Sequence, residues 1–256
     1  MRVLILGGST EASALAQRLA GDSRFEATLS LAGRTSAPKP QPITTRTGGF
    51  GGTQGLSRWL RDNATNAVID ATHPYADRIS ANAVAACREI GVPLASIVRA
   101  AWEMRSGDDW HVVPSTEAAA AALGQRAQRV FLSLGRLELG AFVKAPQHHY
   151  VARVIDPPDV ALPPNMSFLR ARGPFDQAAE ISLLKDEKIE IIVSKNSGGH
   201  ATYAKIEAAR VLALPIVMIA RHDKPAGYVV SSPEAAIAWL LQQPAHDRGS
   251  FSLRGV

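Results

Sequence analysis

Glycine-rich and polar segments that follow apolar runs are the places where this sequence could do chemistry. The first begins at Gly7, directly after the apolar run at residues 3–6. A glycine turn that leads from a strand into a helix can hold a phosphate, because backbone N–H groups and the helix dipole both favour an anion there. The third glycine of the G-x-G-x-x-G pattern is missing, so a tight turn without a ligand is the alternative. We assign to cofactor binding Gly8, Ser9, Thr10 and Glu11.

A second glycine-rich segment, residues 48–52, places four glycines around Phe50. Such a run is entropically costly in a plain connector, but it allows a ligand to approach the backbone closely. We therefore also assign Gly49, Phe50 and Gly51 to cofactor binding. A mobile surface loop is the alternative.

Arg34 follows the strand expected at residues 28–31, where NAD-specific enzymes usually carry an acidic residue. A guanidinium can fork onto the oxygens of a 2′-phosphate, whereas a carboxylate would repel them. Arg34 therefore favours NADPH over NADH as the cofactor, and a solvated surface arginine is the alternative.

Residues 70–76, with the sequence DATHPYA, follow a strand expected at residues 67–69. Open α/β sheets bind their ligands at the carboxyl ends of such strands. We assign Thr72 to cofactor binding and name His73 and Tyr75 as catalytic candidates, since both side chains could donate a hydrogen bond or a proton. A purely structural His-Pro turn is the alternative.

A polar loop at residues 194–199, with the sequence SKNSGG, occupies the corresponding place in the second half of the chain. Its hydroxyl, ammonium and amide groups beside two glycines suit an anion. Arg172 adds a further cation, although it could instead pair with Asp176 or Glu180 on the helix expected after it. The substrate-binding candidates from this half are Arg172, Ser194, Lys195, Asn196, Ser197 and Gly198.

Metal and nucleic-acid chemistry are not expected from this sequence. Cys87 is the only cysteine, and the neighbouring pair His148 and His149 lacks ligating company, so we expect no metal site. The formal charge of +5 favours anionic partners. The basic residues of the chain are scattered along the sequence, so a small anionic ligand is favoured and no nucleic acid is expected.

The elements that must position these residues form a repeated pattern. Apolar runs of strand length are followed by glycine or polar residues and then by alanine-rich helical stretches, which is typical of parallel α/β units. The apolar stretch at 208–220 is interrupted by Arg210 and Pro215, so no membrane partner is expected. The first residues suit a strand better than a secretory signal, and a cytoplasmic location follows as an expectation.

The second half of the sequence echoes the first. Residues 88–93 resemble residues 210–215, which lie 122 positions further along the chain. The same offset relates residues 68–74 to residues 190–196. Chance similarity between βαβ units is the alternative to duplication, and both predict two successive α/β lobes. We expect an N-terminal lobe at 1–110, a C-terminal lobe at 111–243 and a flexible tail at 244–256.

Taken in order, these segments resemble the precorrin-6A reductase family of cobalamin biosynthesis from Ile5 to about Arg221. The resemblance is carried by residues 5–12 (ILGGSTEA), 46–52 (RTGGFGG), 70–76 (DATHPYA), 99–102 (RAAW), 172–175 (RGPF) and 194–199 (SKNSGG) with Lys205. Six such segments in the same order are specific. The departures are small: Ser9 stands where threonine is usual, and Ala100-Ala101 where proline is usual before Trp102.

The resemblance implies two Rossmann-like lobes with mainly parallel sheets and a cleft between them. It implies hydride transfer from NADPH to one carbon–carbon double bond of the precorrin-6A macrocycle, a tetrapyrrole polycarboxylate, and it adds Lys205 to the substrate-binding candidates. Exchange of substrate and product with neighbouring pathway enzymes is a further expectation. A non-catalytic NADP-binding sensor and a Rossmann-type transferase are the alternatives.

Overall fold

The computed structural model describes residues 1–33, 35 and 38–244, which form two compact α/β units. Unit 1 comprises residues 1–99 together with the chain from Asp223 onward, and unit 2 comprises residues 100–222. Arg34 and all of the expected tail except Pro244 lie outside the described residues. Within the described ranges, no helix is long and apolar enough to cross a membrane.

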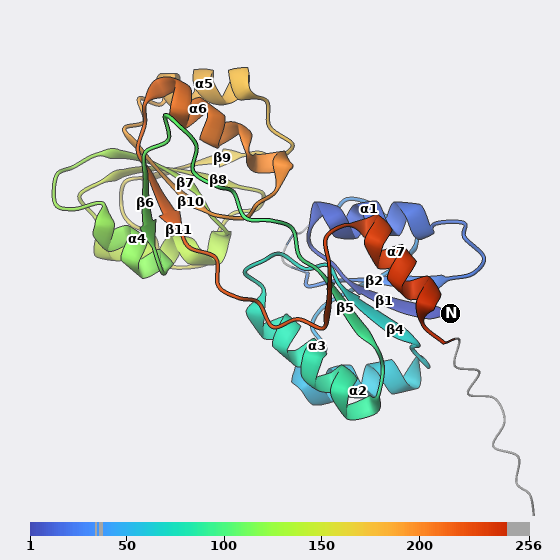
Figure 1. Ribbon diagram of the computed structural model, residues 1–256. Helices are drawn as coiled ribbons and strands as arrows, with labels where there is room; N and C mark the ends of the chain where they lie inside the picture. The colour runs from blue at the N-terminus through green and yellow to red at the C-terminus, as the bar shows by residue number, and fades with distance from the viewer. Residues whose placement is uncertain (34, 36–37, 245–256) are drawn as a thin grey trace, which may run out of the picture. The chain divides into compact units, whose positions relative to one another are not determined.

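Unit 1 is a parallel six-stranded sheet in the order β12-β5-β4-β1-β2-β3. The strands are β1 (Arg2–Leu6), β2 (Glu26–Leu31), β3 (Thr44–Thr47), β4 (Ala67–Asp70), β5 (Leu94–Ile97) and β12 (Tyr228–Val230). The helices are α1 (Thr10–Leu19), α2 (Gly52–Asp62), α3 (Asp77–Ile90) and α7 (Pro233–Gln242). Helices α1 and α7 pack together on one face of the sheet, and α2 and α3 pack together on the other (Figure 1).

Apolar side chains on both faces explain why β1 lies inside this sheet. Val3 and Ile5 pack into the core beneath α1 and α7, whereas Leu4 and Leu6 pack beneath α2 and α3. A strand covered on both faces needs a continuous apolar run, which is what the sequence shows at residues 3–6.

Unit 2 repeats this plan with the strand order β6-β11-β10-β7-β8-β9, again parallel throughout. The strands are β6 (Trp110–Val113), β7 (Arg129–Ser133), β8 (His149–Val154), β9 (Met166–Arg170), β10 (Ile191–Lys195) and β11 (Ile216–Ile219). The α-helices are α4 (Thr116–Ala122), α5 (Gln177–Asp186) and α6 (Ala204–Leu212), and the 3₁₀ helices are η1 (Arg136–Lys144) and η2 (His200–Thr202). Helix α5 packs against α6, and α4 packs against η1.

The two units exchange their outermost strand. Strand β6 follows β5 in the chain but completes the sheet of unit 2, and β12 follows β11 but completes the sheet of unit 1. By their internal contacts the units divide after Arg99 and after His222, whereas the sequence placed the end of the N-terminal lobe at residue 110 and residues 223–243 in the C-terminal lobe. The apolar periodicity of a short strand does not reveal which sheet receives it, and this explains the difference.

Candidate functional site

The turn after β1 is open beside Gly8. Within the described part of the chain, a Cβ at Gly8 would meet no atom beyond its chain neighbours within 4 Å, and the φ of Gly8, +123°, is a conformation that residues with side chains rarely adopt. The first N–H groups of a helix lack partners within the helix, so the start of α1 can receive an anion at this turn. This geometry suits a phosphate.

The side chains of the same turn hold it in place. The Ser9 hydroxyl donates to the carbonyl oxygen of Ala71 at 2.7 Å and accepts from the Ala12 N–H at 3.1 Å, which ties the start of α1 to the end of β4. Thr10 is exposed, and its hydroxyl donates to Glu11 at 3.2 Å. These contacts make the backbone of the turn, rather than the Ser9 hydroxyl, the part that suits a ligand.

Glu11 forms an ion pair with Arg99, with 2.6 Å between Oε2 and Nη1. Partial burial acts to raise the pKa of the Glu11 carboxyl, but the hydrogen bond and charge of Arg99, together with hydrogen bonds from the Glu11 backbone and Ser9, leave the pKa below its usual value. Glu11 is therefore an anion at neutral pH, and Arg99 supplies the compensating positive charge beside the turn.

The glycine run after β3 is open as well. Among the described residues, and apart from its own chain neighbours and the nearby backbone of its helix, a Cβ at Gly48, Gly49, Gly51 or Gly52 would meet no atom within 4 Å. Gly51 has a φ of +81° and precedes the first residue of α2, with no side chain capping the helix. The predicted close approach of a ligand to Gly49 and Gly51 is sterically possible here, and Phe50 between them is half-buried.

Arg46 holds this run in shape and is a residue that we had not assigned. Its guanidinium donates to the carbonyl oxygens of Gly48 at 3.0 Å and Gly49 at 3.2 Å, and to the Ser30 hydroxyl at 2.6 Å. It also lies 3.9 Å from the centre of the Phe50 ring, a cation–π contact. Partial burial lowers the pKa of Arg46 below its ordinary value. Its position two residues before Gly48 was the signal in the sequence.

Thr72 lies at the end of β4, and its polar atoms have partners inside the protein. Its N–H and hydroxyl donate to Asp70 Oδ1 at 3.0 and 2.7 Å, and its hydroxyl accepts from the Lys224 ammonium at 2.8 Å. Thr72 is also buried. These internal bonds hold the Thr72 hydroxyl, and the assignment of Thr72 to cofactor binding stays a prediction.

His73 and Tyr75 lie next to each other beyond Thr72. Their ring centroids are 5.7 Å apart with an angle of 32° between the planes, and the Tyr75 N–H lies 3.4 Å from His73 Nδ1. Both residues are half-buried. An imidazole beside a phenol can donate or relay a proton, so the two remain catalytic candidates.

In unit 2, β10 ends at Lys195, whose ammonium pairs with Glu138. Ser194 and Ser197 are buried. The Ser194 hydroxyl donates to the Lys195 carbonyl oxygen at 3.2 Å, and the Ser197 N–H donates to the same oxygen at 2.8 Å. The loop is thus closely folded around Lys195.

Asn196 and Gly198 contact residues 100–102, the first residues of unit 2. The Asn196 amide accepts from the Trp102 N–H at 2.7 Å and donates to the Trp102 carbonyl at 2.9 Å. A Cβ at Gly198 would lie 1.9 Å from the carbonyl oxygen of Ala100. Residues 100–102 therefore contact both positions, and substrate binding by Asn196 and Gly198 stays a prediction.

Lys205, a substrate-binding candidate from the family resemblance, has its side chain inside the protein, and its role in substrate binding stays a prediction. The residue is 3% exposed, its ammonium donates to the Thr202 carbonyl at 2.8 Å, and it lies 4.8 Å from the Trp102 ring. Burial lowers the pKa of Lys205 to about 7, with Glu180 acting to raise it and Arg153 to lower it. Glu180 itself is held by Arg153, with nitrogen and oxygen 2.6 Å apart.

The structure brings most unit 1 candidates to one edge of one sheet. The turn with Gly8, the run with Gly49 and Gly51, and the segment with His73 and Tyr75 follow β1, β3 and β4, and parallel strands end at the same edge. Arg172 is exposed and follows β9 in unit 2. In the described part of the chain, no group of three or more His, Cys, Asp or Glu side chains could hold a metal.

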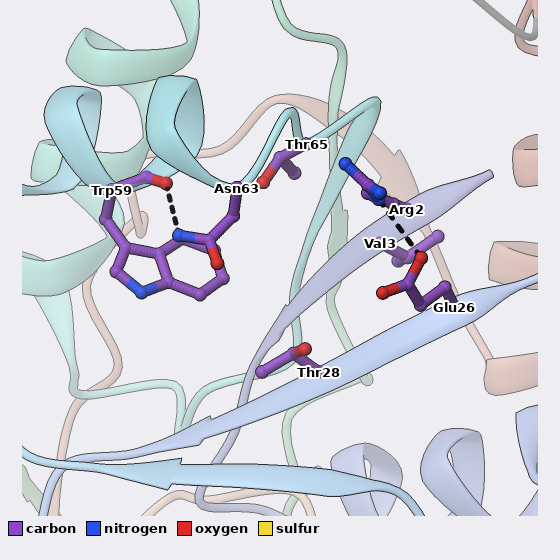
Figure 2. Close-up of a pocket in the computed structure, with 7 residues that line it drawn as sticks. All are labelled: Arg2, Val3, Glu26, Thr28, Trp59, Asn63 and Thr65. Carbon is purple, nitrogen blue, oxygen red and sulfur yellow. Dashed lines mark hydrogen bonds and ion pairs between the residues drawn. The ribbon is translucent and has the colours of Figure 1, made fainter.

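A small hollow lies at the opposite edge of the unit 1 sheet. Figure 2 shows it near the starts of β1 and β2, where Arg2 and Glu26 form a hydrogen bond of 3.0 Å. Its volume is about 40 Å³, far smaller than the pockets of several hundred Å³ that hold cofactors. This hollow is therefore not the site of the candidate residues.

Known proteins resemble this chain along nearly its whole length. The family model described as precorrin-6x reductase CbiJ/CobK matches residues 2–241. A precorrin-6A reductase of Rhodobacter capsulatus is 49% identical over 249 residues, which are 97% of this chain and 99% of that protein. A cobalt-precorrin-6A reductase of Priestia megaterium is 26% identical over 254 residues, 94% of this chain and 98% of that protein.

A solved structure described as CobK precorrin-6A reductase has the same fold. Its TM-score is 0.90 at 48% sequence identity, and the match covers 97% of this chain and 99% of that one. The matched region includes both units and the exchanged strands. The chain therefore belongs to the precorrin-6x reductase family.

Proposed function

We propose that this protein reduces one carbon–carbon double bond of precorrin-6A, with NADPH as the hydride donor, in cobalamin biosynthesis. The observation that carries the proposal is the 49% identity over 97% of the chain to a relative named precorrin-6A reductase. Relatives named cobalt-precorrin-6A reductase are far less similar, at 25–26% identity. This contrast favours the cobalt-free macrocycle.

The open glycine turns of unit 1 fit a dinucleotide. Backbone N–H groups at the start of α1 would receive the pyrophosphate, and the bare surface of the run at Gly49 and Gly51 would lie against the adenosine end. When bound, the reduced nicotinamide supplies a hydride. Arg34 would favour the 2′-phosphate of NADPH.

The side chains beyond β4 would complete the reduction. The double bond gains a hydride at one carbon and needs a proton at the other. His73, with Tyr75 beside it, would donate that proton or order the water that does so. In unit 2, Lys195 and the exposed Arg172 would bind substrate carboxylates.

The ligands of the proposed reaction suit an aqueous compartment. NADPH and a macrocycle with several carboxylates are both charged and soluble in water. A cytoplasmic site of action, with substrate received from and product released to neighbouring pathway enzymes, is part of the same proposal.

Anaerobic titration with each cofactor, followed by addition of precorrin-6A, tests the proposal. We expect NADPH to bind more tightly than NADH and to be oxidised only when the macrocycle is added. Arg34→Ala should reduce the preference for NADPH, and the same change at the exposed Arg58 on α2 is the control. Tight NADPH binding without oxidation would instead support a cofactor sensor.

A further inference from the structure

Two short segments carry the chain from one unit into the other. Each forms hydrogen bonds at the carboxyl end of the corresponding strand of the sheet that it enters, which is β10 in unit 2 and β4 in unit 1. Residues 100–102 enter unit 2, where the Trp102 backbone bonds to Asn196 beyond β10. Residues 223–227 enter unit 1, where Lys224 bonds to Asp70 and Thr72 at the end of β4. Trp102 and Lys224 are separated by the offset of 122 that relates the two halves of the sequence.

The anchor in unit 1 is a buried ion pair. The side chains of Lys224 and Asp70 are 4% and 1% exposed, with 3.1 Å between ammonium and carboxylate. The ammonium also donates to the Thr72 hydroxyl at 2.8 Å and approaches the Thr72 carbonyl oxygen at 3.4 Å. Among the described residues Asp70 Oδ2 has no hydrogen-bond partner. Lys224 is therefore the cation that balances the charge of Asp70 in the interior.

Lys224 contacts Thr72 directly at the hydroxyl and at the carbonyl oxygen. It also binds the Asp70 carboxylate, which accepts a hydrogen bond from the Thr72 N–H. The next residue is His73, whose carbonyl oxygen accepts from the Ala76 N–H at 2.9 Å. A shift of Thr72 would move the start of this turn and both rings that it carries. The position of the His73 and Tyr75 rings thus depends on a residue that enters unit 1 from far along the chain.

We infer that Lys224 is a positioning residue for the reduction, which holds residues 72–75 at the cofactor edge of unit 1. The inference rests on the proposed function. Misplacement of a reacting group by about 1 Å costs roughly 10²-fold in rate. The glycine turns that would hold the phosphates do not involve Lys224, so cofactor affinity should change far less than turnover.

Two variants and a control separate positioning from simple stability. Lys224→Met removes the ammonium, and the double variant Asp70→Asn with Lys224→Met also removes the buried negative charge while keeping an oxygen that can accept from Thr72. Arg210→Met is the control. Arg210 lies in the last turn of α6, and the change breaks its ion pair with the buried side chain of Asp108. Each protein is measured for melting temperature, NADPH dissociation constant and single-turnover rate with precorrin-6A.

We expect Lys224→Met to lower both the melting temperature and the single-turnover rate, the rate by roughly 10²-fold, with a dissociation constant within about threefold of the original. The double variant should regain most of the melting temperature but not the rate. Arg210→Met should lose stability and keep the rate. Recovery of both stability and rate in the double variant would overturn the inference, because Lys224 would then only neutralise Asp70.

Amide hydrogen exchange tests the same anchor without substrate. Exchange at residues 72–76 should be faster in Lys224→Met than in the unmodified protein, while exchange at residues 194–199 stays unchanged. Unchanged exchange at 72–76 would overturn the role of Lys224. If the unmodified protein failed to reduce precorrin-6A, the proposed function would fall while this measurement still reported on the anchor.

Discussion

At the scale of single residues, Lys205 shows how burial changes a chemical group that looks suited to a ligand. Its ammonium is surrounded by Trp102, the Thr202 carbonyl and the pair formed by Arg153 and Glu180. Burial lowers the pKa of Lys205 to about 7, so the unfolded chain holds this proton more tightly than the folded one. The folded state is therefore penalised below the ordinary lysine pKa, most strongly below pH 7, and gains stability as pH rises above about 7.

Lys205→Met removes this pH dependence. Relative to the variant, the original protein should gain up to about 1.4 kcal/mol of unfolding free energy per pH unit between about pH 7 and 10. Urea unfolding of both proteins at several pH values measures the difference. A constant difference across that range would show that the folded protein holds the Lys205 proton normally.

Replacement of His73 tests its role in proton donation. In His73→Asn the shape is similar but the titratable ring is lost, so kcat should fall by roughly 10²- to 10⁴-fold with a changed pH profile. Steady-state rates between about pH 6 and 9 are the measurement. An unchanged rate and profile would remove His73 from the acid role and leave the proton to water or Tyr75.

Gly198 is predicted to be required for folding rather than for substrate. With a φ of +71° and the Ala100 carbonyl 1.9 Å from an added Cβ, Gly198→Ala should lower the unfolding free energy by about 1–3 kcal/mol. Gly8→Ala is the matched comparison, since it also has a positive φ but has open space around it. Equal stability losses in the two variants would contradict the predicted clash.

At the scale of elements, the strands and helix starts follow from local sequence. Strands such as β1 and β4 are buried on both faces and appear as continuous apolar runs. The starts of α4 and α7 are marked by Ser115 and Ser232, whose hydroxyls accept from the backbone N–H three residues on, at 3.1 and 3.2 Å. These two helices follow the two exchanged strands.

Loss of either helix cap should destabilise the protein by a similar amount. Ser115→Ala and Ser232→Ala should each lower the unfolding free energy by about 1 kcal/mol, because a helix N–H loses its acceptor. Ser13→Ala, inside α1, is the control and should cost little. Thermal or urea unfolding provides the values, and a cost at Ser13 as large as at the caps would contradict the assignment.

At the scale of the whole molecule, the sequence predicted two parallel α/β lobes, and its two halves resemble each other. It did not predict the exchange of β6 and β12 between the two sheets. Local patterns identify a strand, whereas its partner depends on contacts between distant residues. Contacts between distant residues also determine the candidate site, and local sequence patterns do not reveal them. Gly8 and the glycine run are open as expected, but the bonds of Asn196 to Trp102 and of Lys224 to Asp70 join residues far apart in sequence. Such partners decide which polar groups can reach a ligand.

The most direct test of the proposed reduction uses NADPH deuterated at the transferred position. Purified protein, this cofactor and precorrin-6A are incubated without oxygen, and the product is examined by mass spectrometry while NADPH oxidation is followed by absorbance. We predict that one NADPH is consumed for each macrocycle and that the product gains one deuterium from the cofactor and one hydrogen from water. A macrocycle that remains unchanged, or that is reduced without deuterium, would contradict the account.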